Sequence, residues 1–582
     1  MRKTRIVCTL GPASEAQEVM IKLIEAGMDV ARINLSHGSH EEHARRLAEL
    51  RRACERVGRP VAVMLDTKGP EIRLGAFKGG FAQLREGEIF TLTTRDVPGD
   101  SSIANVGHAG FPGDVRRGMI VLLDDGNIAL TVLDVGETDV RCRVLNDGTI
   151  RDGKKVNLPD AEVSLPALSD SDIEDLRFGV AQGVDFVAAS FIRKESDVLA
   201  IRRVIEEAGG DQHIISKIES KEGVRNLDEI LKVSDGLMVA RGDLGVEIPA
   251  EDVPLVQKAM IERCNRLGKP VITATQMLES MVSRPRPTRA EASDVANAIF
   301  DGTDAVMLSA ETATGKYPVE SVAMMARIAE RAESSLRYEE ILAKKRTVAA
   351  RTVTDAISSA TCGMANDLGA AAIITATESG HTARMVAKYR PRAPVLGVTP
   401  HESTMRKLLL VWGVVPTLVA PSRGTDEMIE QAVGAGLAKG LIKQGDLVVI
   451  TAGVPMGIPG TTNLIKVQTV GDVLVRGTGI GSRPATGRAC VAKTAKDAAA
   501  KFRGGDILVV QGTDSDFITF IRDSAGVICE EGGLTCHAAI AALQYRIPAV
   551  VGAEGATSIL KDGQVVTIDA ARGLVYRGPA SV

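Results

Sequence analysis

Short apolar runs of strand length recur along the first part of the chain and alternate with segments in which apolar residues return every three or four positions. The eight runs are RIVCTL from residue 5, VARINLS from 30, VAVMLDT from 61, FVAASF from 186, IISKIE from 214, GLMVARGD from 236, VITATQ from 271 and AVMLSAET from 305. The helical period is found in residues 41–57, 195–208, 253–267 and 318–335. Continuous apolar runs suit strands of a parallel sheet buried on both faces. Eight strand–helix units of this kind predict a closed (β/α)8 barrel of the α/β class.

The pattern changes to a period of two between residues 70 and 166. Segments such as EIFTLTT and GMIVLLDD alternate apolar and polar positions, and Asp125-Gly126 and Asn146-Asp147-Gly148 are turn signals. This predicts a small all-β domain inserted in a βα loop. Such a loop lies on the carboxyl edge of the barrel, so we expect a lid that swings over the site and excludes water.

The chain after residue 342 predicts two further domains. The runs AAIITAT, VLGVT and LVVITAG are strands of an α/β unit that extends to about residue 475. A joint rich in Gly, Thr and Ser, residues 477–487, precedes about a hundred further residues. The predicted domains are therefore a barrel (1–69 and 167–342), a lid (70–166), an α/β domain (343–475) and a C-terminal extension (476–582).

Composition narrows the class of protein. The 582 residues are 45% hydrophobic and 25% charged, with a net charge of −4, so no basic field favours nucleic acid. No apolar run reaches membrane-spanning length, and the apolar stretch in MRKTRIVCTLGPAS is too short for a signal peptide. The eight cysteines form no CxxC pair, as is typical of reduced thiols. We expect a cytoplasmic protein with no membrane or nucleic-acid partner.

Polar residues stand at or just after the carboxyl end of seven of the eight predicted strands. They are Arg32, Asn34 and Ser36; Asp66, Thr67, Lys68 and Arg73; Ser190; Lys217 and Glu219; Asp243; Thr275 and Gln276; and Ser309 and Glu311. At any single position, an ordinary solvated strand end explains the residue equally well. The set as a whole contains cations for phosphate, acids for a metal, and hydroxyls and amides for orientation. It predicts a phosphoryl-transfer site with a hard divalent cation.

Several long sequence motifs resemble those of a known enzyme family. NLSHG from residue 34, DTKGPEIR from 66, SKIES from 216, ARGDLG from 240, ATQMLESM from 274 and MLSAETATGKYP from 307 resemble pyruvate kinase, over residues 1–475. The resemblance implies transfer of the phosphoryl group of phosphoenolpyruvate to ADP, which gives ATP and the enolate of pyruvate in the last step of glycolysis. It also implies Mg²⁺ or Mn²⁺, K⁺, and a homotetramer.

The resemblance assigns roles to the central residues. Glu219 and Asp243 would hold the divalent metal, with Gly242 beside them in the substrate-binding stretch. Lys217 would lie against the transferring phosphoryl group and balance the charge of the enolate. Arg32 and Arg73 would clamp phosphate oxygens, although salt bridges at the barrel rim are an alternative for both.

Further roles follow from the same resemblance. Asn34, Ser36, Asp66 and Thr67 would form a potassium site, and Glu71 suggests that the ion is required, because relatives with lysine there supply their own charge. Thr275, Ser309 and Glu311 would form a proton relay through water. His37 and Lys155 would bind nucleotide phosphates, with Lys154 as the alternative to Lys155.

In the third domain, TESGHTA follows a predicted strand and opens a helix, which favours anion binding. It resembles the family's sugar-phosphate effector loop. Glu378 would repel a second phosphate, so we expect a monophosphate activator, such as a sugar monophosphate or AMP. The residues around its phosphate would be Thr377, Ser379, Gly380, His381 and Thr382; a plain capped turn is the alternative.

The extension contains EEGGLTCHAAIAALQYRIPAVVG from residue 530, which resembles the phosphohistidine domain of PEP-utilising enzymes. If the extension works like that domain, His537 would be the phosphorylated residue. Cys536 stands where serine is expected and the chain has no ATP-grasp partner, so a structural or regulatory role is favoured over a phosphocarrier.

Two short glycine motifs, ATGKY near Lys316 and GTGIGS from Gly477, lack the full Walker and dinucleotide patterns, and both are interpreted as turns. A carbon–carbon lyase of the phosphoenolpyruvate and pyruvate barrel group and a catalytically silent effector-binding protein remain alternative functions.

Overall fold

The computed structural model describes residues 1–347, 352–422, 424–453 and 462–580. The chain forms two compact units: Met1–Ala350 with Ser379–Arg390 and His401–Leu418, and Arg351–Glu378 with Pro391–Pro400 and Val419–Val582. In the described residues, no helix has both the length and the apolar composition needed to cross a bilayer. All eight cysteines are free thiols.

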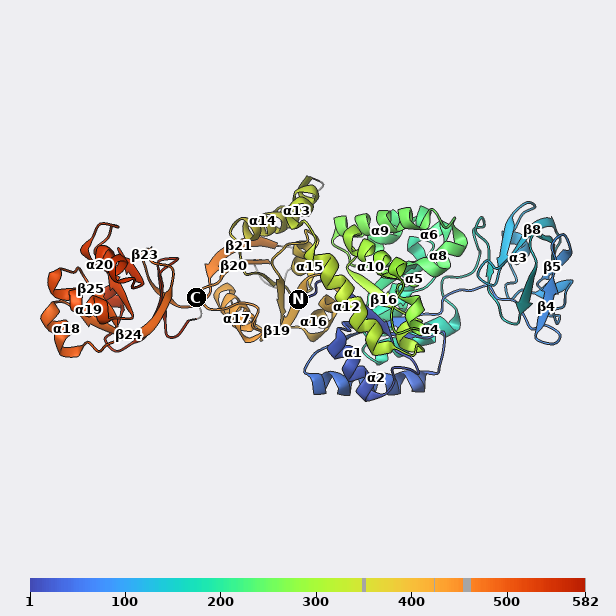
Figure 1. Ribbon diagram of the computed structural model, residues 1–582. Helices are drawn as coiled ribbons and strands as arrows, with labels where there is room; N and C mark the ends of the chain where they lie inside the picture. The colour runs from blue at the N-terminus through green and yellow to red at the C-terminus, as the bar shows by residue number, and fades with distance from the viewer. Residues whose placement is uncertain (348–351, 423, 454–461, 581–582) are drawn as a thin grey trace. The chain divides into compact units, whose positions relative to one another are not determined.

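The first unit is built on a closed parallel barrel of eight strands, and all eight predicted strands are confirmed (Figure 1). The strands are β1 (Arg5–Thr9), β2 (Val30–Asn34), β3 (Ala62–Asp66), β12 (Phe186–Ala189), β13 (His213–Ile218), β14 (Gly236–Ala240), β15 (Val271–Ala274) and β16 (Ala305–Leu308). Side chains such as Met64, Phe186 and Met238 fill the barrel interior. The strands are mostly apolar because their other face is buried against the helices.

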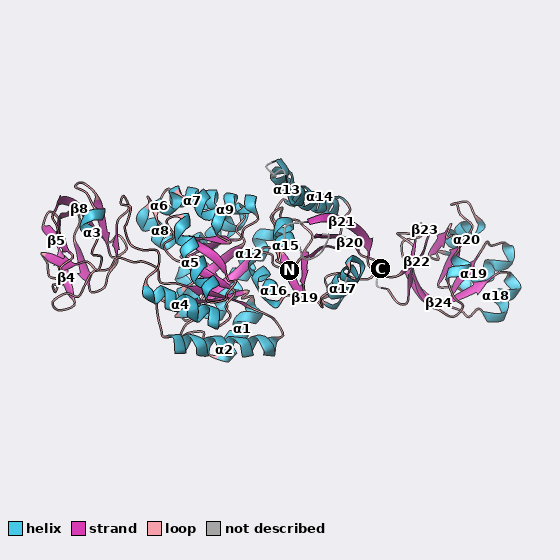
Figure 2. Cartoon of the chain, turned by 180° about the vertical axis from the view of Figure 1, so that it is seen from behind, coloured by secondary structure: helices cyan, strands magenta, loops and turns pink. Residues whose placement is uncertain are grey.

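Helices surround the barrel, as the cyan ribbons around the magenta strands in Figure 2 show. They include α1 (Gln17–Ala26), α2 (His40–Val57), α4 (Asp170–Ala181), α5 (Glu195–Glu207), α6 (Lys221–Arg225), α7 (Leu227–Val233), α8 (Arg241–Glu247), α9 (Val253–Leu267), α10 (Arg289–Asp301), α11 (Ala310–Ala313) and α12 (Pro318–Ser334). Helix α13 (Tyr338–Thr347) follows α12 along the chain. The four predicted helices are confirmed as α2, α5, α9 and α12. Helix α2 begins with a capping box in which Ser39 and Glu42 each accept a backbone N–H from the other, which satisfies two otherwise unpaired donors.

The inserted segment is an all-β domain, as predicted, with one short helix, α3 (Phe111–Asp114). Its two sheets have the orders β11-β7-β8-β9-β5-β6 and β10-β4. The strands are β4 (Phe81–Leu84), β5 (Ile89–Thr93), β6 (Ile103–Asn105), β7 (Ile120–Leu123), β8 (Ile128–Val135), β9 (Asp139–Val144), β10 (Gly148–Arg151) and β11 (Val156–Asn157). The turn at Asp125-Gly126 closes the antiparallel β7–β8 hairpin. The turn at 146–148 instead carries the chain from one sheet to the other, because β10 pairs with β4.

The second unit contains two sheets. In the first, β18 (Val395–Thr399), β17 (Ala372–Ala376), β20 (Leu447–Gly453) and β21 (Thr462–Thr469) lie in that order, with helices α14 (Val353–Asp367) and α17 (Thr425–Ala438) in the same unit. The three predicted strands are confirmed as β17, β18 and β20.

The second sheet has eight strands in the order β22-β29-β28-β24-β25-β26-β27-β23. They are β22 (Val473–Arg476), β23 (Thr478–Ile480), β24 (Pro484–Ala492), β25 (Ile507–Val510), β26 (Gly526–Cys529), β27 (Ala549–Val551), β28 (Val565–Asp569) and β29 (Leu574–Arg577). The helices of this part are α18 (Ala495–Lys501), α19 (Ile518–Asp523), α20 (His537–Tyr545) and α21 (Ala556–Ile559).

The interpretation of residues 477–487 as a joint, with GTGIGS as a turn, is wrong. Strand β22 ends at Arg476, β23 pairs with β27, and β24 begins inside the segment. The glycines allow close packing: a Cβ on Gly479 would lie 1.8 Å from the carbonyl oxygen of Ala570, and one on Gly477 2.4 Å from that of Val551. Glycine in this segment therefore marks a close approach of backbones inside a sheet.

Candidate active site

A cavity of about 550 Å³ lies at the carboxyl edge of the barrel. It is lined by residues from five successive strand ends and from the returning arm of the lid: Arg32, Asn34, Ser36 and His37; Asp66, Lys68, Glu71 and Arg73; Gly153 and Lys155; Ser190 and Phe191; and Lys217, Glu219 and Asp243. The structure thus brings together most of the residues that the sequence places at strand ends. They share a cavity because parallel strands of a closed barrel end at one face.

Lys217 is a buried cation near the end of β13. Its Nζ donates to Ser190 Oγ at 2.7 Å and to Asp66 Oδ1 at 3.1 Å, and lies 3.1 Å from Glu219 Oε1. Burial alone would lower the pKa of Lys217, but the charges of Asp66 and Glu219 outweigh it and raise the pKa above its ordinary value. The side chain therefore presents a fixed positive charge in a largely dry site.

Asp66 lies between two cations. Its Oδ2 accepts from Arg32 Nε at 2.6 Å, while its Oδ1 accepts from Lys217. Burial opposes ionisation of Asp66, but the charges of Arg32 and Lys217 hold its pKa below the usual range. The ionised carboxylate orients both cations, and Arg32 is further fixed by a 2.9 Å bond to Thr9 Oγ1.

Glu219 and Asp243, from adjacent strand ends, line the same cavity. Burial raises the pKa of Glu219; the positive charge of Lys217 opposes this rise and the negative charge of Asp243 adds to it. Two neighbouring carboxylates suit a divalent cation. No cluster of three or more His, Cys, Asp or Glu side chains suited to a metal occurs in the part of the chain that the structure describes. This donor set fits Mg²⁺, which takes few protein oxygens and keeps sites for water and phosphate.

The lid arm contributes Lys155. Its Nζ lies 2.8 Å from Asp243 Oδ1 and 2.7 Å from Glu71 Oε1. Burial lowers its pKa, yet the two carboxylates raise it overall. Lys154, the alternative at this position, pairs instead with Asp124 at 2.6 Å and does not line the cavity.

Arg73 lies at the cavity rim and is held by the same carboxylate as Lys155. Its Nε donates to Glu71 Oε2 at 2.9 Å, and its Nη1 donates to the carbonyl of Gly153 at 2.8 Å. The rim salt bridge considered for Arg73 is therefore present, and the guanidinium still borders the cavity.

Three of the four residues expected to bind potassium, Asn34, Ser36 and Asp66, line the cavity. Asn34 Oδ1 accepts the backbone N–H of Ser36 at 3.1 Å. Thr67 is buried beside them, and its carbonyl accepts from Ser190 Oγ at 2.7 Å. The oxygen atoms of this group are mixed side-chain and backbone atoms, which suits a large monovalent ion.

Thr275, Ser309 and Glu311 are not among the cavity-lining residues. Thr275 has a positive φ of 65°, and its Oγ1 accepts the N–H of Gly242 at 2.8 Å. Glu311 is buried and accepts the N–H groups of Ser309 at 2.7 Å and Leu278 at 3.1 Å. Burial raises the pKa of Glu311. Glu311 thus ties together the loops that follow β15 and β16.

Two residues contribute to the site in ways that the sequence did not predict. Ser190 was placed at a strand end without a role, and the structure shows it bridging Lys217 and Thr67. Phe191 was not singled out, yet its N–H donates to Glu219 Oε2 at 2.6 Å and its ring lies 5.3 Å from Lys155 Nζ. It adopts a positive φ of 55°, which no residue pattern in the sequence indicates.

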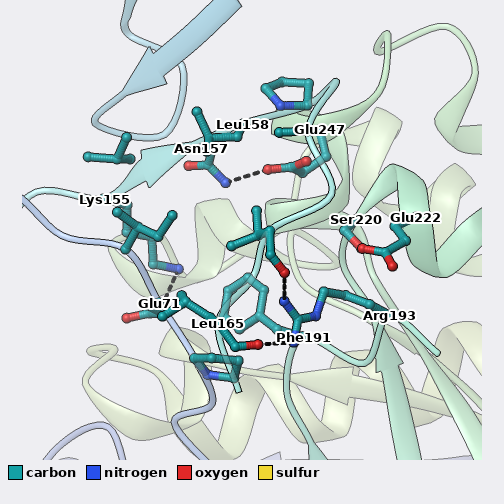
Figure 3. A pocket seen from close by; sticks show the side chains of 16 residues that line it. Glu71, Lys155, Asn157, Leu158, Leu165, Phe191, Arg193, Ser220, Glu222 and Glu247 are labelled. Atoms are coloured by element: carbon teal, nitrogen blue, oxygen red, sulfur yellow. Dashed lines mark hydrogen bonds and ion pairs between the residues drawn. The ribbon is translucent and has the colours of Figure 1, made fainter. Parts of the chain in front are cut away.

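A second, smaller cavity of about 70 Å³ lies where the lid arm meets the barrel (Figure 3). Arg193 donates to the carbonyls of Val163 and Leu165 at 2.7 Å each, and Asn157 Nδ2 donates to Glu247 Oε1 at 2.8 Å. Burial raises the pKa of Glu247 to about 7.

This raised pKa predicts a pH-dependent stability. The folded protein holds the Glu247 proton more tightly than the unfolded chain, whose pKa is 4.5, so stability falls between pH 4.5 and about 7 and stays reduced above it. Glu247→Gln keeps the acceptor for Asn157 and removes this cost, which is at most about 3 kcal/mol. Its thermal unfolding midpoint should exceed that of wild type at about pH 8 and match it at about pH 4. Exposed Glu251→Gln should show no such difference; equal midpoints for Glu247→Gln and wild type at both pH values would refute the assignment.

A closed parallel barrel with a buried lysine, arginines and two carboxylates at its carboxyl edge defines an enzyme built for phosphorylated substrates. Family models match the chain in three places: the pyruvate kinase barrel domain at residues 1–322, the pyruvate kinase alpha/beta domain at 355–468, and the mobile domain of PEP-utilising enzymes at 502–573. The chain belongs to the pyruvate kinase family and is a phosphotransferase.

Relatives match over the whole length. The chain is 53% identical to the pyruvate kinase of Geobacillus stearothermophilus and 52% identical to that of Bacillus licheniformis, in each case over 100% of both chains. A crystal structure of a pyruvate kinase from Cryptosporidium parvum is 40% identical, with a TM-score of 0.77, and the match covers 81% of this chain and 96% of that one. The fold predicted from the sequence, including the C-terminal extension, is confirmed.

Proposed function

We propose that the cavity at the carboxyl edge performs phosphoryl transfer from phosphoenolpyruvate to ADP through a preorganised set of charges. The observation that carries this proposal is the buried Lys217, held between Asp66 and Glu219 on the wall of a 550 Å³ cavity. A β-phosphate oxygen of ADP forms a bond to phosphorus, the bond from phosphorus to the enolate oxygen breaks, and the enolate carbon then takes a proton. Glu219 and Asp243 would hold the divalent metal, which supplies positive charge to the phosphoryl and carboxylate oxygens when bound.

The cations have separate tasks in this proposal. Lys217 compensates the charge that moves onto the enolate oxygen, which is a contribution realised in the transition state. Arg32, fixed by Asp66 and Thr9, and Arg73 at the rim hold phosphate oxygens of the substrate. Lys155 and His37 bind the phosphates of the nucleotide, Lys155 from the lid arm and His37 beside the end of β2.

Protonation of the enolate is assigned to a water ordered by Thr275, whose backbone strain is typical of functional positions. Ser309 and Glu311 support it, because Glu311 joins the loop after β16 to the loop that carries Thr275. The substrate-binding stretch at Gly242 is bonded directly to the Thr275 hydroxyl.

We further propose that the enzyme requires K⁺, bound by Asn34, Ser36, Asp66 and Thr67. Glu71 supports this requirement, because a carboxylate there cannot replace a cation. Pyruvate formation from phosphoenolpyruvate and ADP should therefore fall at least about tenfold when K⁺ is replaced by a large organic cation, as expected for loss of a charge-assisted contact. Full activity without K⁺ would contradict the site, and the absence of pyruvate formation from phosphoenolpyruvate and ADP would favour the lyase alternative.

Regulation is proposed through the loop at residues 377–382. Thr377 directly follows β17, and Gly380, with a φ of 78°, precedes α15 (His381–Ala387). With Ser379 and Thr382, these residues would bind a monophosphate activator, while Glu378 would exclude a bisphosphate.

We also propose a cytoplasmic homotetramer that acts in glycolysis.

For the extension we propose a structural or regulatory role. His537 begins α20, and its Nδ1 lies 2.9 Å from Thr513 Oγ1. The chain should therefore take up no acid-labile ³²P from labelled phosphoenolpyruvate at His537. A label that is retained in wild type and lost in His537→Gln would establish a phosphocarrier instead.

A further inference from the structure

A third cavity, of about 420 Å³, lies in the first unit at the opposite end of the barrel from the catalytic cavity. Its walls come from the ends of α9 and α10, from α13, from the residues after α15, and from Trp412. Gly302 lines it just before β16, and Arg266 lines it at the end of α9, which leads into β15. It therefore opens at the amino-terminal edge of β15 and β16, away from the catalytic residues.

The lining is strongly cationic. Six basic side chains face two carboxylates, and both carboxylates are already engaged: Asp301 with Lys258, and Glu262 with Arg266 at 3.4 Å. The other four cations are Lys344, Lys345, Lys388 and Arg390. Within the described residues, neither Lys344 nor Lys345 has a carboxylate partner.

Two of the cations are buried in the wall. Arg390 is only 3% exposed and lies 3.0 Å from Asp304 Oδ1, with its guanidinium 4.8 Å from the Trp412 ring. Lys388 is 9% exposed and donates to the carbonyl of Arg266 at 3.1 Å. Lysine and arginine are rarely so buried unless their charge is compensated. Asp304 pairs directly with Arg390.

Lys345 shows the resulting excess of positive charge. Its Nζ donates to Asn265 Oδ1 at 2.7 Å. Burial and the nearby charges of Arg390, Lys388 and Lys344 lower its pKa to about 7, and Asp304 opposes this only partly. An anion bound in the cavity would offset the repulsion among these positive charges. A ligand with more than one negative charge would offset it most and would therefore bind most strongly.

We propose that this cavity binds a phosphate monoester, with Lys344, Lys345 and Arg390 around the phosphate group. The volume exceeds that of a phosphate ion and falls in the range of small-molecule sites. The site goes beyond the proposed catalytic function and differs from the loop at residues 377–382. It shares with that loop the short helix α15, which begins at the loop and ends at Ala387, directly before Lys388.

The chain offers a direct probe, because Trp412 is its one tryptophan and it lines the cavity. Tryptophan emission should change saturably on titration with glucose 6-phosphate and should not change with glucose. In the double variant Lys344→Gln/Lys345→Gln the apparent Kd should rise at least about tenfold, as expected for the loss of charge-assisted hydrogen bonds. Lys345→Arg should retain binding, and Lys22→Gln on helix α1, an exposed control, should behave as wild type.

The proposal can be overturned in two ways. It fails if neither inorganic phosphate, glucose 6-phosphate nor AMP changes the emission of the wild-type protein. It also fails if the double variant binds with the wild-type Kd, because the ligand would then occupy another site. If the tryptophan emission instead changes with protein concentration and not with added phosphate compounds, the cavity would be part of a contact between copies of the chain.

Discussion

Lys217→Met is expected to lower kcat by about a hundredfold to a thousandfold, with little change in the affinity for phosphoenolpyruvate. The ammonium is buried and held by Asp66, Ser190 and Glu219, so it needs no reorganisation when charge develops on the enolate oxygen. Removing one preorganised donor of this kind typically costs about 10²–10³ in kcat. Because other cations remain to bind phosphate, the loss should fall on turnover and not on binding.

The measurement is steady-state kinetics with direct binding of phosphoenolpyruvate, and the matched control is Lys232→Met. Lys232 lies on helix α7 with 69% of its side chain exposed, so this variant should have wild-type kcat. The Lys217 variant also leaves two buried carboxylates with one fewer cation, and circular dichroism must show that it is folded. If the variant is folded and has a near-normal kcat, Lys217 has no role in the mechanism.

Asp243→Asn is expected to raise the Mg²⁺ concentration for half-maximal activity by about a hundredfold or more. Changes to the residues behind a metal ligand already cost about 10–100-fold in metal affinity, and the two carboxylates that we assign to the ion lie directly on the cavity. The substitution also removes one of the two carboxylate partners of Lys155, whose charge then opposes a cation more strongly. Glu219→Gln should act in the same direction, because it too removes a negative charge.

Metal binding can be measured without turnover by titrating Mn²⁺ and recording its electron paramagnetic resonance signal. The wild-type protein should show a saturable site that Asp243→Asn weakens. Asp228→Asn, an exposed carboxylate on α7 that pairs with Arg263, should leave it unchanged. If both Glu219→Gln and Asp243→Asn bind Mn²⁺ with the wild-type affinity, the metal must bind at a different site.

The barrel could be predicted from the sequence because its strands carry a strong local signal. Runs such as VAVMLDT and IISKIE are apolar on both faces, and only a parallel sheet covered by helices buries both. The residues at strand ends followed from topology, since eight parallel strands deliver their carboxyl ends to one face. Lys217, Glu219 and Asp243 were found this way.

The residues that the sequence did not indicate depend on contacts between distant segments. Phe191 serves through its backbone N–H and a positive φ, neither of which depends on a recognisable side-chain pattern. Residues 477–487 were misinterpreted because glycine marks flexible joints and close backbone contacts alike, and the nearby Ala570 carbonyl that distinguishes them is far along the chain.

By itself, the sequence determined the order of strands and helices, the barrel and the chemical character of the catalytic edge, because periodicity and residue type are local properties. The tertiary structure alone decided which carboxylate pairs with which cation, that Lys155 and not Lys154 enters the cavity, and that a cationic cavity forms at the other end of the barrel. Those outcomes rest on burial and on distances of a few ångströms between segments far apart in the chain, and electrostatic interactions vary steeply with both.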